Sequence, residues 1–502
     1  MNPSIPTPRH PFPPAFAALA LLVFGVAMPL DGRGQAAAAR SSGPIAAADP
    51  VLSETAARPV AEVIDEYVRQ ALQSNLTLQS QSFDVERNIA ALDGARARYL
   101  PTVALEARYT RAEGGREFDV PVGDLLNPVY GTLNQLLAAQ GRPAPFTPIA
   151  NQAIPFQRER EQDTRFTVRQ ALYAPAIPAA VRAQRAQLES SQFDRVALGR
   201  RIKRDVTVAY LDWLKANRTV GIVEASLSLL NENVRVNESL FRNGKITEDQ
   251  VLRARAEQLA VVQQLRDAQN GQSQARSYVN FLLNRSLDEP LHVATIDSEI
   301  GRTAHDLGVL RTEALANRPE IRQLDRVITA AESQVQVARA SLKPSLSLGV
   351  DAGINDEQYD FGHGSNFSTI SLLLRWQFFD GGASSAQARG ARADARRAAT
   401  QRDEISQQIQ LEVQQALDRL EATADSLDTA SARADAAHAA FRIASRKRDE
   451  GVINQVEFID ARSTLTSAEL NLNVTRFDLL ARQAELDYAT ASGTLPVDLA
   501  AH

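Results

Sequence analysis

The chain repeats itself, and this duplication limits the folds that it can adopt. "RNGKITEDQVLRARAEQL" at 242–259 and "RDEGVINQVEFIDARSTL" at 448–465 each place a glycine ahead of a segment rich in Ala, Leu and Gln, and the two glycines lie 207 positions apart. Further upstream, "QALQSNLTL" at 70–78 matches "EALANRPEI" at 313–321 with an offset of 243. Two copies of one structural unit fit this pattern better than a long solenoid of short repeats.

The two copies differ in length at one place. The offset between them falls from 243 to 206 between Tyr109 and Thr164. The first copy therefore carries an excursion with the Pro- and Gly-rich sequence "VPVGDLLNPVYGTLNQLLAAQGRPAPFTP" at its centre. We expect an irregular loop over residues 111–163.

Long helices are expected in each copy. Apolar residues in the first copy follow the spacing 3, 4, 3, 4, which is the heptad rhythm of packed helices, at Val220, Val223, Leu227, Leu230 and Val234. Residues 176–241 contain no proline after Pro178. Such a helix would be on the order of 100 Å long at 1.5 Å per residue. Residues 384–449 of the second copy are similarly uninterrupted and rich in alanine.

Four other segments alternate with period two and predict β-strands. The segments are "TVALEARYT" and "TRFTVRQAL" in the first copy and "SLSLGVDAG" and "TISLLLRWQFF" in the second. Strands of about nine residues can cross a bilayer when they are tilted. Four strands of a soluble sheet with one wet face would alternate in the same way. The aliphatic face, which ends in aromatic residues, favours membrane strands.

Proline and glycine mark abrupt junctions between helices and strands. Pro101 and Pro344 end a helix, because the residue before a proline is pushed out of the α region. Pro175 and the pair Gly381–Gly382 stand where the next helix starts. Each strand is therefore expected to prolong a helix axis.

The N-terminus has the features of a secretory signal. Arg9 and His10 precede the apolar run "PAFAALALLVFGVAMPL", and small residues follow in "GQAAAAR". We expect a signal peptide over residues 1–38, cleaved near Ala38, although a retained anchor would also fit the apolar run. Beyond it, no run of about 18 apolar residues suggests a transmembrane helix.

Composition excludes several classes of function. The net charge of −5 gives no reason to expect nucleic-acid binding. The absence of cysteine excludes disulfides, thiolate metal sites and a lipid-modified cysteine. The six histidines form no pair at i, i+3 or i, i+4, and no Walker loop, GxSxG or GxGxxG motif is present. We therefore expect neither a cofactor nor an enzyme.

The four predicted strands cannot close a barrel within one chain. In lipid, an open sheet would leave two edges of unpaired backbone groups, each group costing several kcal/mol. Two chains would give eight strands, and three would give twelve strands with a wider lumen. The attached helices would then continue the wall, and Gly244 and Gly451 would be the tips at which an outgoing helix reverses.

At this point the sequence resembles the TolC-like outer-membrane efflux proteins. The resemblance is carried by "ALANRPEI", "KPSLSL", "WQFFDGG" and the two glycine-containing tips. It implies a mainly α fold with β-structure, in which duplicated helical hairpins form an α-barrel through the periplasm. Four strands per chain would contribute to a trimeric, twelve-stranded transmembrane β-barrel in the outer membrane of a Gram-negative cell.

The resemblance also implies a function and partners. The homotrimer would be the passive exit duct of a tripartite efflux or type I secretion system. It would contact outer-membrane lipid, a periplasmic adaptor (membrane fusion) protein and an inner-membrane transporter, which supplies the energy. A periplasmic coiled-coil adaptor or a structural protein is the alternative. Adaptors, however, have one helical hairpin flanked by small β-domains, whereas this sequence has two.

This interpretation divides the chain into five parts. Residues 1–38 are the signal peptide and 39–60 a flexible segment. Residues 61–300 form the first repeat, with its long loop at 111–163 and its tip at Gly244. Residues 301–494 form the second repeat, with its tip at Gly451, and 495–502 are a C-terminal tail.

Candidate site residues follow from the same resemblance. Some members place two acidic residues, three apart, on the pore-facing helix after the second tip, and Glu457 and Asp460 occupy those places. Spacing i, i+3 puts them on one helix face, so three copies would form a ring of six carboxylates that favours cations. A solvated coiled-coil face is the alternative. Some members also latch the closed state with an arginine, which is Ile453 here.

Two further groups of residues are candidates. The expected adaptor contacts at the tips, which could instead only staple the turns, are Gly244, Lys245, Ile246, Thr247, Gly451, Val452, Ile453 and Asn454. A girdle at the membrane interface is expected from Trp376, Phe378 and Phe379, for which core packing is the alternative.

Overall fold

A computed structural model describes residues 58–295, 305–360, 362, 364–497 and 499. These residues belong to one compact unit that begins at Ala56. The expected signal peptide, the cleavage site near Ala38 and nearly all of the segment 39–60 lie outside the described residues.

The helices occur in matched pairs, one from each half of the chain. In the first half they are α1 (Val60–Ser74), α2 (Leu76–Ala97), α4 (Ala176–Arg242) and α5 (Glu248–Leu282). In the second half they are α6 (Leu307–Asn317), α7 (Pro319–Ala340), α8 (Ala383–Asp449) and α9 (Gln455–Ala489). Both α2 and α7 have 22 residues, both α4 and α8 have 67, and both α5 and α9 have 35. The predicted duplication into long helical hairpins is confirmed.

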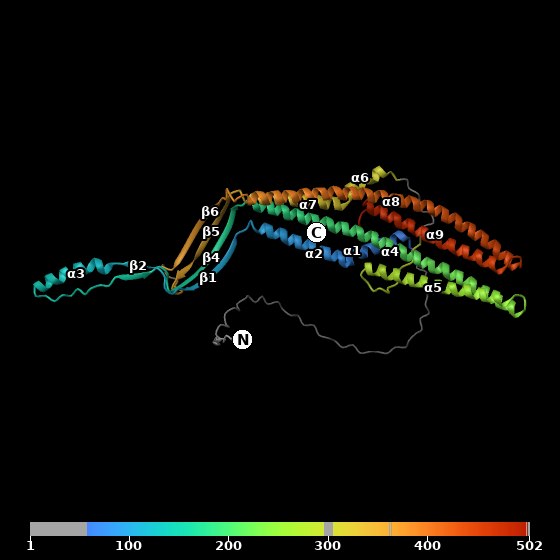
Figure 1. Ribbon diagram of the computed structural model, residues 1–502, viewed down its shortest axis with the longest axis horizontal. Coiled ribbons are helices and arrows are strands. Elements are labelled where there is room, and N and C mark those ends of the chain that lie inside the picture. The colour runs from blue at the N-terminus through green and yellow to red at the C-terminus, as the bar shows by residue number, and fades with distance from the viewer. Residues whose placement is uncertain (1–57, 296–304, 361, 363, 498, 500–502) are drawn as a thin grey trace, which may run out of the picture. The chain divides into compact units, whose positions relative to one another are not determined.

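Four strands form one antiparallel sheet in the order β1-β4-β5-β6. The strands are β1 (Thr102–Arg111), β4 (Arg160–Tyr173), β5 (Ser345–Asp356) and β6 (Asn366–Arg375). Each of the four predicted strand segments overlaps one of them. The helices α2, α4, α7 and α8 adjoin the strands at one end of the sheet, and the excursion of the first copy lies at the other (Figure 1).

The excursion between β1 and β4 is ordered, and the expectation of an irregular loop is wrong. It contains β2 (Glu117–Val120), α3 (Val122–Ala139) and β3 (Gln152–Pro155), and β2 pairs with β3. Pro128 and Gly131 lie inside α3 and hide its helical character in the sequence. Asparagine side chains attach the helix to the returning segment of the chain.

Beta-strand β6 is shorter than its sequence pattern predicts. It ends at Arg375, so Trp376, Phe378 and Phe379 follow the strand instead of continuing it. The Trp376 indole donates a hydrogen bond to the Leu342 carbonyl at 3.2 Å and its ring lies edge-on to Phe378. Contacts near the helix junction therefore replace the sheet ladder here.

The largest hydrophobic core joins α1, α4, α5 and α9. Tyr67, Tyr210 and Trp213 are buried at its centre, and Tyr67 lies edge-on to Tyr210. Leu499 of the predicted tail also packs into this core. A second core, around Ile409 and Val413, joins α8 to α9 and α6. The long α4 packs along α2, α5, α7 and α9 and so connects the two copies.

Candidate functional site

The two hairpin tips have the same backbone geometry. Gly244 and Gly451 both adopt left-handed φ angles, +64° and +72°. The Lys245 amide donates to the Leu240 carbonyl at 2.9 Å, and the Val452 amide donates to the Lys447 carbonyl at 2.7 Å. These bonds, with those from each glycine to a carbonyl three residues earlier, form the Schellman motif that ends many helices. A Cβ at either glycine would meet no atom within 4 Å, so conformation alone calls for glycine.

The helix after the second tip begins with a side-chain cap. Asn454 is its N-cap, and its amide oxygen accepts a hydrogen bond from the Glu457 amide at 2.9 Å. The Asn454 amide nitrogen donates to a Glu457 carboxylate oxygen at 3.2 Å. Glu457 is exposed in the first turn, and Asp460 is exposed one turn later. The helix dipole stabilises a carboxylate at this end.

The apolar tip residues differ in exposure. Val452 is 67% exposed, whereas Ile246 and Ile453 are half-buried. Lys245 and Thr247 are exposed, and Thr247 is the N-cap residue of α5. Phe458 is buried behind the second tip, and the Arg448 guanidinium lies 4.1 Å from its ring centre. Val452 is thus the apolar side chain most available to a partner at the second tip.

A buried arginine ties the two hairpins together, and the sequence reasoning missed it. Arg462 of α9 is 2% exposed and donates hydrogen bonds to Ser226 of α4 and to a Glu257 carboxylate oxygen of α5, each at 2.5 Å. Burial lowers the pKa of the Arg462 guanidinium, and the Glu257 carboxylate opposes this shift. The three residues belong to three helices, so no local spacing could reveal them.

A second buried arginine was noticed in the sequence only as part of a family motif. Arg318, the N-cap residue of α7, forms ion pairs with Glu320 and Glu412 and stacks on Tyr488, 5.0 Å from the ring centre. It also donates to the Tyr488 and Ala489 carbonyls at the end of α9. The "NRPEI" segment therefore joins α7, α8 and α9.

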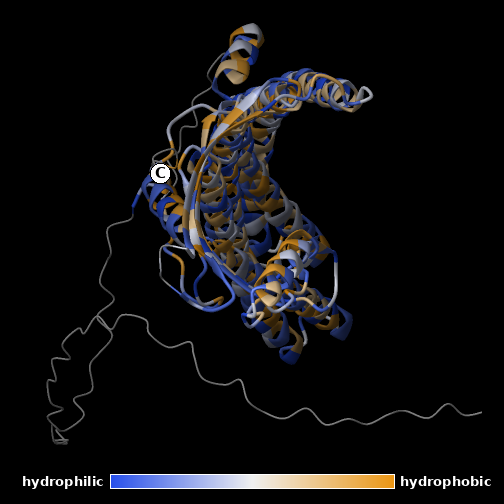
Figure 2. Cartoon of the chain, turned by 90° about the vertical axis from the view of Figure 1, so that its left-hand side faces the viewer, coloured by the Kyte–Doolittle hydropathy of each residue, from blue (hydrophilic) through white to orange (hydrophobic). Residues whose placement is uncertain are grey.

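The four-stranded sheet has one apolar and one polar face. Val103, Val168, Val350 and Ile370 are aligned in register across all four strands. On the other face Arg169 pairs with Asp351 at 2.9 Å, and the buried Asp163 pairs with Arg108 and Arg165. Hydrophobic and hydrophilic residues alternate along the strands (Figure 2). This is the pattern of a sheet with lipid on one side and water on the other.

The predicted junction residues lie between helices and strands. Pro101 and Pro344 directly precede β1 and β5, and Pro175 directly precedes α4. Gly381 and Gly382 have φ of +65° and +90°, and Gly382 is the N-cap residue of α8. The three aromatic residues Trp376, Phe378 and Phe379 stay exposed beside this junction.

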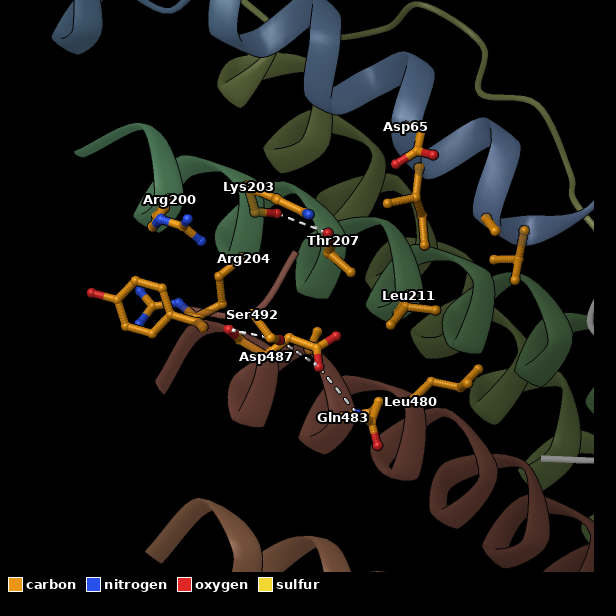
Figure 3. Close-up of a pocket in the computed structure, with 15 residues that line it drawn as sticks. Asp65, Arg200, Lys203, Arg204, Thr207, Leu211, Leu480, Gln483, Asp487 and Ser492 are labelled. Carbon is orange, nitrogen blue, oxygen red and sulfur yellow. Dashed lines mark hydrogen bonds between the residues drawn. The ribbon is translucent and has the colours of Figure 1, made fainter. Parts of the chain in front are cut away.

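A cavity of about 330 Å³ lies where α1 and the end of α9 meet α4. Arg200, Lys203 and Arg204 of α4 line it together with Asp65 and Asp487 (Figure 3). The Asp487 carboxylate accepts hydrogen bonds from Gln483 and Ser492, each at 3.2 Å. Charges of both signs therefore line this cavity.

No group of three or more His, Cys, Asp or Glu side chains among the described residues is placed to hold a metal ion. None of the described helices combines the length and the apolarity needed to cross a bilayer.

Comparison with known proteins gives similarity in sequence and in fold. The family described as outer membrane efflux protein matches residues 310–492. The probable efflux pump outer membrane protein SepC of Pseudomonas putida is 24% identical over 304 residues, covering 58% of this chain and 60% of that protein. The solvent efflux pump outer membrane protein SrpC of the same species is 25% identical over 307 residues, covering 58% and 62%. The chain thus spans less than two thirds of the length of these curated relatives.

Solved structures extend the similarity over most of the chain. The outer-membrane channel OprN superposes with a TM-score of 0.69 at 21% identity, covering 87% of this chain and 91% of that one. The CmeC outer membrane channel of Campylobacter jejuni gives a TM-score of 0.70 at 17% identity, covering 87% and 88%. Both of these proteins are described as outer-membrane channels. The resemblance to the TolC-like outer-membrane efflux proteins is therefore confirmed, in the sequence of residues 310–492 and in a fold shared with solved outer-membrane channels.

Proposed function

We propose that this protein is the outer-membrane exit duct of a tripartite efflux or type I secretion system. Three copies form a channel that conducts substrates passively across the periplasm and the outer membrane. A passive channel catalyses no reaction and needs no cofactor. An inner-membrane transporter supplies the energy. Its relatives SepC and SrpC are named as outer-membrane proteins of efflux pumps, which supports this proposal.

The observation that carries the proposal is the open sheet. Within the described residues, β1 and β6 each have a neighbouring strand on one side only. The apolar row Val103–Val168–Val350–Ile370 runs from one edge to the other. Lipid would suit this row, yet the unpaired backbone groups at the edges could not remain open in lipid.

Pairing between chains resolves this conflict. The sheet has four antiparallel strands, so β1 and β6 run in opposite directions. The β6 edge of one chain can therefore pair with the β1 edge of the next and continue the antiparallel pattern around a ring. Three chains supply twelve strands and a lumen that is too wide for side chains to fill. The polar face with Arg169 and Asp351 then lines the water-filled interior.

The long helices extend the same wall into the periplasm. Each of α4 and α8 has 67 residues and is on the order of 100 Å long. The tips at Gly244 and Gly451 then form the end that faces the inner membrane. We assign the adaptor contact to Lys245, Ile246, Thr247, Val452, Ile453 and Asn454, with Val452 as the most exposed apolar contact.

The carboxylates after the second tip form the entrance. Glu457 and Asp460 of three copies supply a ring of six carboxylates that attracts cations and disfavours anions. Just before the start of α8, at the end of that helix away from the second tip, Trp376, Phe378 and Phe379 lie at the membrane interface, where aromatic side chains face both lipid and water. In this architecture, residues 61–300 and 301–494 are the two repeats.

The proposal is tested on protein extracted from outer membranes in detergent. The native mass is measured first, and the same sample is then added to a planar lipid bilayer. We expect a mass of three chains and discrete conductance steps. A monomer that gives no conductance would overturn the proposal. A soluble periplasmic monomer would instead favour the coiled-coil adaptor.

A further inference from the structure

The excursion of the first copy carries an apolar stripe that the described chain leaves partly exposed. Leu125 of helix α3 is 70% exposed, and four further aliphatic side chains share its side of the helix: Leu126 and Leu133 are 37% and 39% exposed, and Val129 and Leu136 are 52% and 58% exposed. The spacing of these four is 3, 4, 3, which is the spacing of residues that pack one helix against another. The second copy has no room for a counterpart, because only the nine residues 357–365 join its two strands.

The flank of α3 next to the stripe is already occupied. The Asn127 side chain exchanges two hydrogen bonds with the Ile149 backbone, at 2.8 and 2.9 Å. Two helical turns further on, the Asn134 side chain exchanges two hydrogen bonds with the Phe146 backbone, at 2.7 and 3.2 Å. Tyr130 packs on the ring of Phe146 between them. The returning segment therefore fixes the orientation of α3 and directs the stripe outward.

The start of α3 is held equally firmly. The Asn151 side chain accepts hydrogen bonds from the Gly123 and Asp124 amides, at 3.0 and 3.1 Å, which cap the helix. A Cβ at Gly123 would lie 2.3 Å from the Ile149 carbonyl oxygen, so only glycine allows this close approach. An excursion built this closely presents the stripe in a defined position.

We propose that the α3 stripes of the three copies pack against one another over the outer mouth of the channel. This inference rests on the proposed function, which brings the excursions of three chains to the same end of one barrel. The excursion leaves the sheet from β1, the edge strand that would pair with the neighbouring chain. Tethering raises the effective concentration of the three helices to the range in which short helices associate.

The charge of α3 argues against a lipid surface as the occupant. Helices that lie on membranes carry lysine and arginine on their polar face. Helix α3 contains neither, and its only charged residue is Asp124. Packing against the same stripe of two other copies needs no lysine or arginine on α3.

Symmetry fixes where the stripes meet. In a cyclic trimer, a surface that contacts its own equivalent in every other chain lies at the rotation axis. The axis of the barrel passes through its lumen, so the packed helices stand in the exit path. They form an apolar constriction there, in contrast to the carboxylate ring at the entrance.

The absence of natural cysteine allows a direct test. Leu133→Cys is placed on the stripe, and the matched control Gln135→Cys is placed on an exposed position of the same helix that points elsewhere. Each variant is purified as the detergent-solubilised oligomer, its native mass is measured, and it is oxidised with copper phenanthroline. We expect disulfide-linked dimers on non-reducing gels from Leu133→Cys and no such dimers from Gln135→Cys.

The remaining outcomes are distinguishable. A trimer in which neither cysteine crosslinks, or in which both crosslink equally, would overturn the helix cluster and leave the channel proposal standing. A monomer would overturn both. A fluorophore on Leu133→Cys that becomes shielded only when lipopolysaccharide-containing vesicles are added would assign the stripe to lipid and contradict the cluster.

Conductance provides a second readout that does not depend on crosslinking. The double substitution Leu126→Gln and Leu133→Gln makes the stripe polar without adding charge. We expect a larger single-channel conductance than in the unchanged protein, whereas Gln135→Ala leaves the conductance unaltered. An unchanged conductance in the double variant would contradict a constriction at the exit.

Discussion

The Arg462 guanidinium and the Glu257 carboxylate form a hydrogen-bonded ion pair of 2.5 Å between the two repeats. Arg462 lies on α9 of the second hairpin, and Glu257 lies on α5 of the first. The arginine is almost completely buried and also bonds Ser226 of α4. Lys215 of α4 and Asp478 of α9 form another ion pair between the repeats at 3.2 Å, so polar contacts at several levels help to hold the hairpins in register.

Arg462→Met is expected to destabilise the protein. Removing a buried charged donor leaves Ser226 and Glu257 without this partner, and hydrogen bonds to charged groups are worth about 2 kcal/mol. The control is Arg255→Met at the equivalent position of the first repeat, where the arginine pairs with Glu238 at an exposed site. Exposed pairs contribute at most about 1 kcal/mol. Equal shifts of the denaturation midpoint in the two variants would contradict a special role for Arg462.

Gly451→Ala is expected to lower the free energy of unfolding by about 1 kcal/mol, because alanine is strained at a left-handed φ. Nothing lies within 4 Å of the new Cβ, so the effect comes from backbone conformation alone. Gly271→Ala inside α5 is the matched control, since its Cβ also meets nothing. That change should stabilise by about 0.5–1 kcal/mol. Denaturant unfolding of both variants measures the two signs, and a stabilising Gly451→Ala would contradict the turn geometry.

The sequence predicted the parts of the fold that repeat. The heptad spacing, the alternating segments and the paired glycines placed the long helices, the strands and the turns close to their observed positions, because these patterns are local. Helix α3 escaped prediction, since Pro128 and Gly131 interrupt its pattern and its support comes from residues 146–151. Arg462 also escaped prediction, because its partners lie in another repeat and no local pattern points to them.

Ile370→Arg is expected to block assembly in the membrane. Ile370 ends the apolar row on β6, and an arginine facing lipid near the middle of a bilayer costs about 2–4 kcal/mol. Thr369→Arg is the control, because its side chain points to the opposite, polar face beside Asp351. The amount of trimer in outer-membrane fractions measures both. Comparable loss for the two variants would contradict a lipid-facing row.

The proposed entrance ring is tested by removing its charges one at a time. Asp460→Asn and Glu457→Gln each delete three of the six carboxylates in a trimer and keep the side-chain size. Glutamine can still accept the hydrogen bond from Asn454, so the start of α9 stays capped while the charge is lost.

Both variants are expected to lose cation selectivity, because the field of a charged ring at a narrow entrance sets which ions enter. The measurement is the reversal potential across a planar bilayer with a salt gradient. Asp249→Asn, an exposed acidic residue in the first turn of α5, is the control and should leave the reversal potential unchanged. If Asp249→Asn shifts the potential as much as Asp460→Asn does, the selectivity arises from the net charge of the tips, and Glu457 and Asp460 belong to a solvated coiled-coil face.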